Sequence, residues 1–507
     1  IGAEFFGNVN DSVDLDLIKM CCEIVFLSRK KRVVISLNDS YFINHFLESL
    51  KLSKKETIKY YKNYINKGLS TAFRILGLNI LDIKSANGCT LEMTNGEKIL
   101  DFTSAIGILA LGHNHEKIIE VERKFHELKL VDSQKFGPNK LQAALAYNLA
   151  QILPADLDVT FFSVSGAEAV ESAIKLSTMA KGKEGKYFIS ANDGYHGKTL
   201  GALSVTDTEN FSEGFLLGLP EENTIKIPFN DIEAYKKIIQ KLTKEKIIAL
   251  IVEPLQGQIV ECAKKGYLKQ LCKISNENNI AVIFDEIKCG LGRSGNIFAF
   301  LDHDCIPDIV TTSKALGGGK NAISAMISSR KLFNKAYGSI GKSTLHTTTF
   351  FGLGEACATA IETLNIISDE KFINSVKLKS KIVIDNLNKI KDKHPTKIKS
   401  IKGTGLFIGI EFDFDRIISK FEFKSIKIPF VKNIKTVLMG SIIREYLHEY
   451  KILLHFTNAQ PETLVFLPPL NITEDEIFKF INATNKILDK GLAKIFAKFI
   501  VGNIKGH

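Results

Sequence analysis

Residues 308–319 read DIVTTSKALGGG, an apolar run that is followed by a lysine and three consecutive glycines. The run Ile309–Thr312 has the length and the β-branched content of a buried strand. Lys314 comes directly after it, where a surface lysine is not expected, and Gly317-Gly318-Gly319 stops a regular helix. A lysine amine held at such a place can act as a nucleophile and form a Schiff base with an aldehyde. Lys314 is therefore the first candidate for a catalytic residue.

Apolar runs of the same kind precede this stretch and alternate with segments of helical periodicity. This alternation predicts βα units and a mostly parallel sheet that is buried on both faces. Ligands bind beyond the carboxyl ends of the strands in such sheets, so polar residues that follow the strands are candidates for a site. The expected strands are Val159–Val164, Lys186–Ser190, Ile247–Val252, Ala281–Phe284 and Ile309–Thr312.

Ser165-Gly166-Ala167 lies between the first of these strands and a run with helical spacing. Free backbone N–H groups and the positive end of the helix dipole bind anions at such a place, and Gly166 lets a phosphate approach closely. An ordinary capped helix start with Glu168 in its first turn is the alternative interpretation. Tyr195-His196-Gly197 offers an aromatic ring that can stack on a planar ligand, a signal that carries little by itself.

Asp285 follows the strand Ile280–Phe284, and the glycines at 290, 292 and 295 argue against a simple helix after it. A buried carboxylate at this place can keep a pyridine nitrogen protonated, because the ion pair favours both charged forms. A helix cap or a turn is the commoner role of a lone aspartate there. The phosphate cradle, the aromatic ring, the carboxylate and the lysine together are what the cofactor pyridoxal 5′-phosphate (PLP) requires.

The sequence resembles the class III aminotransferases, which act on ω-amino acids and diamines, over roughly residues 51–488, and among them most the putrescine aminotransferases. The matching stretches are SGAEAVESAIK (165–175), YHGKTLGALS (195–204), VEPLQG (252–257), DEIKCGLGRSG (285–295), SKALGGG (313–319) and LHTTTF (345–350). The resemblance implies an α/β protein of PLP fold type I, with a mostly parallel central sheet in a large domain and a smaller α+β domain built from both chain ends. The expected boundaries are 1–66 for an N-terminal helical extension, 67–114 for the N-terminal part of the small domain, 115–360 for the large PLP-binding domain and 361–507 for the C-terminal small domain.

The resemblance also implies a role for each matching residue. Lys314 would form the Schiff base and move a proton, Asp285 would pair with the ring nitrogen, and Tyr195 would stack on the ring. Thr349 matches a threonine that reaches the phosphate in the neighbouring subunit, so a homodimer is expected. The other expected cofactor contacts are the phosphate donors Gly166 and Ala167, Ile287 on the second face of the ring, and Ser165, His196, Glu253 and Lys288.

Departures from the family pattern bear on the substrate. Lys288 stands where the family usually has a glutamine near the phenolic oxygen; lysine can still donate, but it adds a charge. Val465, in TLVFLPP (463–469), stands where many members place an arginine that binds a substrate carboxylate and often pairs with the acid at Glu253. We therefore expect an amine without an α-carboxylate, either a diamine such as putrescine or an apolar amine, with a keto acid or an aldehyde as acceptor. Alternatively, Lys288 or an arginine such as Arg444 replaces the missing arginine, and an ω-amino acid is used.

Two other kinds of function stay open at this stage. PLP aminomutases, epimerases and decarboxylases of the same fold use the equivalents of Lys314 and Asp285 identically, so the motifs do not separate them from an aminotransferase. A non-catalytic relative is the alternative from another class, and the altered residues Lys288 and Val465 are the reason to consider it.

The composition is that of a globular protein. The 507 residues are 45% hydrophobic and carry a formal net charge of +11, and this length is enough for two buried cores. The basic residues are scattered among acidic ones, so we expect no nucleic-acid partner, and the longest apolar runs are too short for a membrane span. Eight cysteines without metal-ligand spacing predict reduced thiols, no metal site and a cytoplasmic location.

Overall fold

A computed structural model describes residues 52–207, 211–242, 244–419, 434–457 and 459–504. The chain forms two compact units, Ile1–Thr71 and Ala72–His507. In the first unit a capping box between Ser53 and Glu56 begins helix α3 (Lys54–Tyr64), and α4 (Lys67–Leu76) runs across the boundary. Residues 1–51, most of the predicted N-terminal extension, lie outside the described residues.

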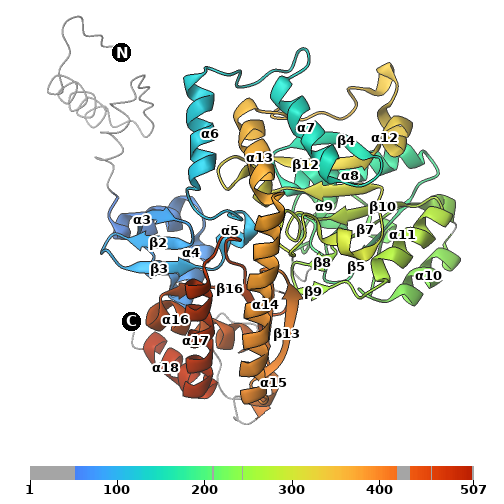
Figure 1. The fold of residues 1–507 in the computed structure, drawn as a ribbon. Helices are drawn as coiled ribbons and strands as arrows, with labels where there is room; N and C mark the ends of the chain where they lie inside the picture. The colour runs from blue at the N-terminus through green and yellow to red at the C-terminus, as the bar shows by residue number, and fades with distance from the viewer. Residues whose placement is uncertain (1–51, 208–210, 243, 420–433, 458, 505–507) are drawn as a thin grey trace, which may run out of the picture. The chain divides into compact units, whose positions relative to one another are not determined.

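The described residues of the second unit form a seven-stranded sheet in the order β4-β12-β11-β10-β7-β5-β6 (Figure 1). Neighbours from β11 to β6 pair in parallel, and only β12 is antiparallel to its two neighbours, β11 and β4. The prediction of a mostly parallel sheet is confirmed. The strands are β4 (Leu157–Ser163), β5 (Tyr187–Ala191), β6 (Thr224–Ile227), β7 (Ile247–Val252), β10 (Ala281–Asp285), β11 (Ile309–Thr312) and β12 (Ser324–Ser329).

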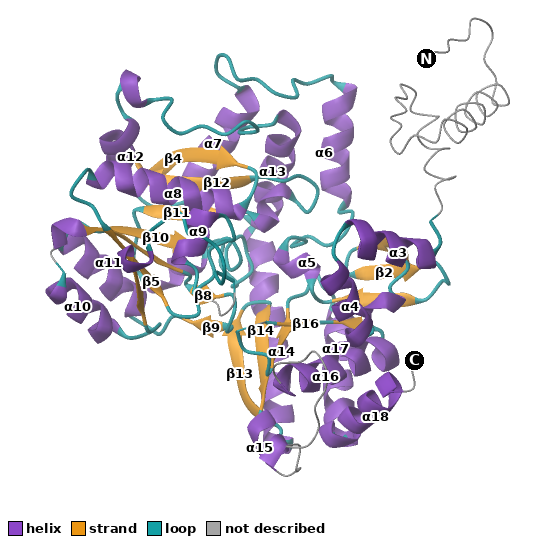
Figure 2. Cartoon of the chain, turned by 180° about the vertical axis from the view of Figure 1, so that it is seen from behind, coloured by secondary structure: helices purple, strands orange, loops and turns teal. Residues whose placement is uncertain are grey.

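Helices lie on both faces of this sheet (Figures 1 and 2). All six residues of β7 are buried, and they belong to two different apolar clusters: Leu250 and Val252 to one, Ile251 to the other. The double burial explains why this strand is a continuous apolar run. The helices of this region are α6 (Glu116–Glu127), α7 (Lys140–Ile152), α8 (Gly166–Lys181), α9 (Leu200–Val205), α10 (Ile232–Lys241), α11 (Tyr267–Glu277), α12 (Arg330–Tyr337) and α13 (Gly354–Ile367).

Two strands of the large sheet, β6 and β12, do not follow from the sequence pattern. The sequence of β12 is SAMISS, which is not an apolar run, although all six residues are buried. Two of its three serines form hydrogen bonds: the hydroxyl of Ser324 lies 2.7 Å from that of Ser163 and donates to the carbonyl of Ser165 at 2.8 Å, and the hydroxyl of Ser329 accepts from the Leu332 amide at 3.3 Å.

Segments from the two ends of the second unit meet in a smaller α+β region. Strand β3 (Lys98–Asp101) pairs in parallel with β15 (Ile452–Leu453), next to the hairpin strands β1 (Ile83–Asn87) and β2 (Thr90–Met93). A second four-stranded sheet has the order β13-β14-β17-β16. The remaining elements are α5 (Ser104–Gly107), β8 (Leu255–Gln256), β9 (Glu261–Cys262), α14 (Glu370–Lys393), β13 (Ile398–Thr404), β14 (Phe407–Phe412), α15 (Phe414–Ser419), α16 (Ile434–Tyr450), β16 (His455–Phe456), β17 (Thr463–Phe466), α17 (Glu474–Lys490) and α18 (Leu492–Ile504).

The boundaries expected at residues 66, 114 and 360 stay predictions. None of the helices in the described ranges is both long enough and apolar enough to cross a membrane.

Candidate active site

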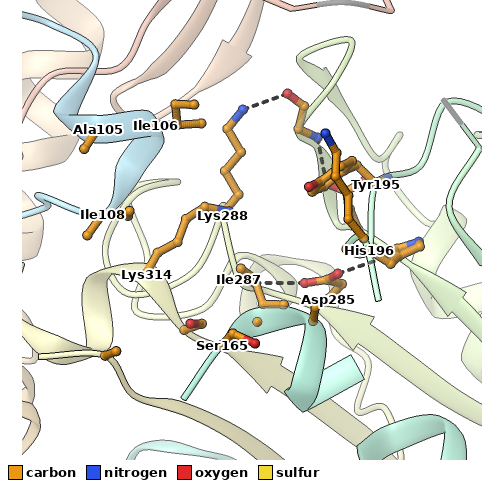
Figure 3. A pocket seen from close by; sticks show the side chains of 18 of the residues that line it. Ala105, Ile106, Ile108, Ser165, Tyr195, His196, Asp285, Ile287, Lys288 and Lys314 are labelled. Atoms are coloured by element: carbon orange, nitrogen blue, oxygen red, sulfur yellow. Dashed lines mark hydrogen bonds and ion pairs between the residues drawn. The ribbon is translucent and has the colours of Figure 1, made fainter. Parts of the chain in front are cut away.

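A cavity of about 1050 Å³ lies at the carboxyl ends of the parallel strands (Figure 3). Glu253 follows β7, Asp285 ends β10 and Lys314 comes shortly after β11, and all three line the cavity. Thr349 is exposed and does not line it. The other predicted residues all do: Ser165, Gly166, Ala167, Tyr195, His196, Ile287 and Lys288. Nearly the whole predicted set therefore lies in one cavity, as expected for residues that follow the carboxyl ends of parallel strands.

The start of α8 combines both interpretations of its sequence. A capping box is present, because the Ser165 hydroxyl accepts from the Glu168 amide and the Glu168 carboxylate accepts from the Ser165 amide. The amides of Gly166 and Ala167 have no partner in the described part of the chain and stand at the positive end of the helix. A Cβ on Gly166 would lie 2.9 Å from the Ile287 side chain, so the close packing here requires glycine.

Asp285 is held in a fixed orientation by two donors. Its Oδ2 lies 2.8 Å from Nδ1 of His196, and its Oδ1 accepts from the Ile287 amide at 3.0 Å. Both side chains are buried, and Nε2 of His196 has no partner among the described residues. Figure 3 shows dashed lines from this carboxylate to Ile287 and to His196. Burial, followed by the charges of Asp285 and Glu253, raises the pKa of Tyr195, so its hydroxyl stays protonated.

Lys314 sits in a backbone conformation that few lysines adopt, with φ of 40°. This strained residue begins a short 3₁₀ turn, Lys314–Gly317, which ends at Gly318 with φ of 66°. Burial is the main effect on the pKa of its amine and lowers it, while the charges of Asp285 and Glu253 act in the opposite direction. A lowered pKa increases the fraction of neutral amine, which is the nucleophilic form.

Glu253 and Lys288 are both tied to Gly257. The Glu253 carboxylate accepts from the amides of Tyr195, at 2.9 Å, and of Gly257, at 2.8 Å, and forms no ion pair with a described basic side chain. The Lys288 ammonium donates to the Gly257 carbonyl at 2.8 Å and lies 4.5 Å from the centre of the Phe407 ring. Burial raises the pKa of Glu253 to about 7 and lowers the pKa of Lys288 to about 7.

Neither Val465, which stands where the family has an arginine, nor Arg444 places a cation in the cavity. Val465 is fully buried in an apolar cluster with Leu255, Val260 and Phe407. Arg444 lies on α16, where its guanidinium is 5.8 Å from the centre of the Phe499 ring, and it does not line the cavity.

Sequence reasoning missed His455, which lines the cavity from β16. Its only signal is a polar residue at the end of the apolar run Ile452–Leu454. The segment Ser104–Ile106 was also missed; it has three consecutive residues with positive φ, and Ala105 and Ile106 line the cavity. No cluster of three or more His, Cys, Asp or Glu side chains in the described ranges is arranged to hold a metal ion.

The residues present fit PLP. Two unpaired amides at a helix start suit its phosphate, the buried and oriented carboxylate of Asp285 suits a pyridinium nitrogen, and the Lys314 amine suits its aldehyde. When bound, PLP supplies an electron sink for bonds at the substrate carbon.

Comparisons with known proteins identify the family and the fold. A family model of class III aminotransferases matches residues 77–488. The fold is similar to that of an ornithine aminotransferase from Toxoplasma gondii, with a TM-score of 0.74 and 24% identity over 91% of this chain and 98% of that one. It is also similar to a transaminase from the marine bacterium Virgibacillus (TM-score 0.72, 22% identity, 82% of this chain and 94% of that one). An (S)-enantioselective omega-transaminase from Thermomicrobium roseum gives a TM-score of 0.72 at 21% identity, over 92% of this chain and 100% of that one.

The solved structures, at these identities, support the fold, and the family match supports the chemistry. The chain belongs to the class III aminotransferases, PLP-dependent enzymes of fold type I.

Proposed function

We propose that this aminotransferase takes the amino group from an amine without an α-carboxylate, either a diamine such as putrescine or an apolar amine, and transfers it to a keto acid or an aldehyde. The observation that carries the proposal is Val465, which is buried among apolar side chains where an arginine would bind a carboxylate. A donor carboxylate placed against this cluster would lose its hydration without gaining the two parallel donors of an arginine, which is costly.

Glu253 supports the diamine within this proposal. Its carboxylate lines the cavity and has two amide donors but no cationic partner among the described residues. The far ammonium of a diamine would supply the missing cation, since a buried charge is stabilised by pairing. The pKa of Glu253 is raised to about 7 by burial, so the carboxylate is charged mainly above that pH. Diamine binding is therefore expected to strengthen as the pH rises through 7.

Three residues have different roles in the transfer of the amino group. Lys314 would hold the cofactor through its amine, and its Nζ would move the proton at the amine-bearing carbon of the substrate. Asp285 keeps its negative charge oriented by His196 and the Ile287 amide. Tyr195, beside this carboxylate, stays protonated and offers its ring for stacking.

A panel of amines tests the proposed donor. The holoenzyme is mixed with putrescine, a long alkyl amine, ornithine or 4-aminobutyrate without acceptor, and the loss of the lysine-bound cofactor spectrum is followed. We expect putrescine or the alkyl amine to react at least about tenfold faster than the two amino acids, because each missing charge partner costs that much or more.

Clear preference for ornithine or 4-aminobutyrate would overturn the proposed donor class. One variant sharpens the panel: Glu253→Gln should slow putrescine more than the alkyl amine, since only putrescine has a second ammonium. An acceptor is then added, and formation of one aminated product per aldehyde released separates transfer from aminomutase, epimerase or decarboxylase chemistry.

We also propose a homodimer in which Thr349 contributes to the site of the neighbouring subunit. The support is the position of Thr349: it is exposed and lies outside the cavity that the rest of the predicted set lines. The cytoplasmic location stays a prediction.

Mixing two inactive variants tests the shared site. Lys314→Ala and Thr349→Ala subunits, exchanged at equal amounts, should regain about a quarter of the wild-type activity, because half of the dimers are hybrids with one intact site of two. Thr347→Ala, also exposed, is the control and should need no partner for activity. If subunit exchange is demonstrated and no activity returns, each site is built within one chain.

A further inference from the structure

His455 occupies the place beside the missing arginine. In the sheet β13-β14-β17-β16, His455 pairs directly with Val465 across the antiparallel strands β16 and β17. Residues directly opposite each other on antiparallel strands point to the same face, with Cβ atoms about 5 Å apart. The imidazole of His455 therefore extends from the strand position next to Val465, and Val465 is where the family's arginine would stand.

The ring of His455 has unused hydrogen-bonding capacity. Both nitrogens are buried from solvent, and neither has a partner in the described part of the chain, although the residue lines the cavity. Buried polar atoms without a partner are rare in folded proteins because each costs free energy, so they indicate a ligand. Burial and the charge of Lys288 lower the pKa of His455 to about 3, which keeps the imidazole neutral, with one nitrogen as donor.

Lys288 brings a positive charge to the same region. Its ammonium is positioned by the Gly257 carbonyl and by the ring of Phe407, which belongs to the same apolar cluster as Val465. An ammonium has three donors, and Lys288 has no ion-pair partner among the described residues. The side chain is therefore held from one side and has donors left for a ligand in the cavity.

We propose that Lys288 and His455 together receive a carboxylate of the amino-group acceptor, so that the acceptor is a keto acid rather than a simple aldehyde. The proposal rests on the aminotransferase function above and names the substrate of its second half-reaction. Lys288 supplies the charge and His455 supplies a neutral N–H, in place of the two parallel donors of an arginine.

Gly257 holds both Lys288 and Glu253 through its backbone. Its amide donates to Glu253, while its carbonyl accepts from Lys288. A Cβ at Gly257 would lie 2.9 Å from Cδ of Lys288 and 3.0 Å from Oε1 of Glu253, so glycine lets both side chains approach the backbone. A diamine and a keto acid, which enter the same cavity in turn, would thus find charges of opposite sign close together on one side of Gly257.

The charge state of Lys288 gives the pair a pH signature. Burial and the charge of Lys314 hold its pKa at about 7, with a smaller contribution from Arg293, while Glu253 and Cys289 act in the opposite direction. His455, with Asp101 as its acidic neighbour, is the other titratable group that faces it. A bound carboxylate stabilises the charged ammonium and raises its pKa, so binding above pH 7 takes up a proton.

The first test compares two acceptors of equal carbon number. Enzyme loaded with the aminated cofactor (pyridoxamine phosphate) is mixed with pyruvate or with propanal, which lacks the carboxylate, and the rate constants are compared. We expect Lys288→Met to lower the pyruvate-to-propanal ratio about 30-fold or more and His455→Phe about tenfold, the usual cost of losing a charged and a neutral donor. A ratio that stays within about threefold of wild type in both variants overturns the proposal.

Because the cofactor is loaded in its aminated form, no amine substrate is needed, and the result is independent of the donor class proposed above. If the variants change the pyruvate-to-propanal ratio but the amine panel shows no preference for putrescine or the alkyl amine, this inference stands and the proposed donor class falls. If the panel shows that preference but the ratio does not change, only this inference falls.

The second test measures binding without turnover. Propionate is titrated into the wild-type holoenzyme at pH 8 by calorimetry in buffers of different ionisation enthalpy, which gives the protons taken up per ligand. Nearly one proton is expected for a group with a pKa of about 7. Lys288→Met should abolish most of this uptake and Glu253→Gln should retain it. If the proton uptake disappears in Glu253→Gln and persists in Lys288→Met, Lys288 is not the partner of the carboxylate and the proposal is wrong.

Discussion

Lys314→Ala protein is expected to lose amino transfer by a factor of about 10⁴ or more while it still binds PLP. The variant removes both the covalent hold on the cofactor and the amine that moves the proton, and proton transfer by a positioned group alone contributes about 10²–10⁴-fold. Binding should persist because the amides at the start of α8 and the carboxylate of Asp285 are untouched. Single-turnover kinetics and the spectrum of the bound cofactor measure the two effects separately.

Lys314→Arg is the matched variant. It keeps a positive charge at this site but cannot form the covalent bond, so it should be as inactive as the alanine variant. An arginine variant that regained a large part of the activity would show that charge, rather than the amine, is what the reaction needs from this position.

Asp285→Asn is expected to slow amino transfer about a thousandfold, which corresponds to about 4 kcal/mol of activation free energy. The asparagine keeps the shape: its one carboxamide oxygen can still accept from the Ile287 amide, and its NH2 group can donate to Nδ1 of His196 in the other tautomer. It lacks the negative charge that keeps the pyridine nitrogen protonated, and the electron sink weakens. Half-reaction rates give the size of the effect, and thermal unfolding shows whether the fold is intact.

Asp308→Asn is a control from the same sheet. Asp308 accepts from the Val282 amide at 2.8 Å and lies just before β11, at the amino end of the parallel strands, away from the cavity. Its rate should stay within about threefold of wild type, as expected for a carboxylate with a structural role only. A loss of tenfold or less in Asp285→Asn would remove Asp285 from its assigned role.

The parts of the site that follow strands of the large sheet could be predicted from the sequence. Continuous apolar runs such as Ile247–Val252 are visible because both faces of the strand are buried. The carboxyl ends of parallel strands meet at one edge, so Glu253, Asp285 and Lys314 had to lie close together. The sequence left two interpretations open for Ser165–Ala167: the capped helix start is observed, and the phosphate site at the amides of Gly166 and Ala167 stays a prediction.

The far wall of the cavity could not be predicted. His455 belongs to a strand of two residues, and its position depends on the register between β16 and β17, which no local pattern reveals. The buried strand β12 was missed because its sequence is not an apolar run, and the hydrogen bonds of its Ser324 are made to residues far away in the sequence. The direction of the Lys288 side chain depends in the same way on the Gly257 carbonyl and on the ring of Phe407.

The central claim, that Lys314 at the end of β11 carries the cofactor, is tested most directly by locating the covalent bond. The wild-type holoenzyme is treated with borohydride, which makes the lysine–cofactor bond permanent, and digested, and the modified peptide is identified by mass spectrometry. We predict one modified residue, Lys314, in the peptide that contains Ser313 and Gly317-Gly318-Gly319. Modification of another lysine of the cavity would contradict the assignment; Lys288 is the first alternative, because it is also buried and its pKa is also lowered. The absence of any modified peptide from active enzyme would contradict the assignment as well.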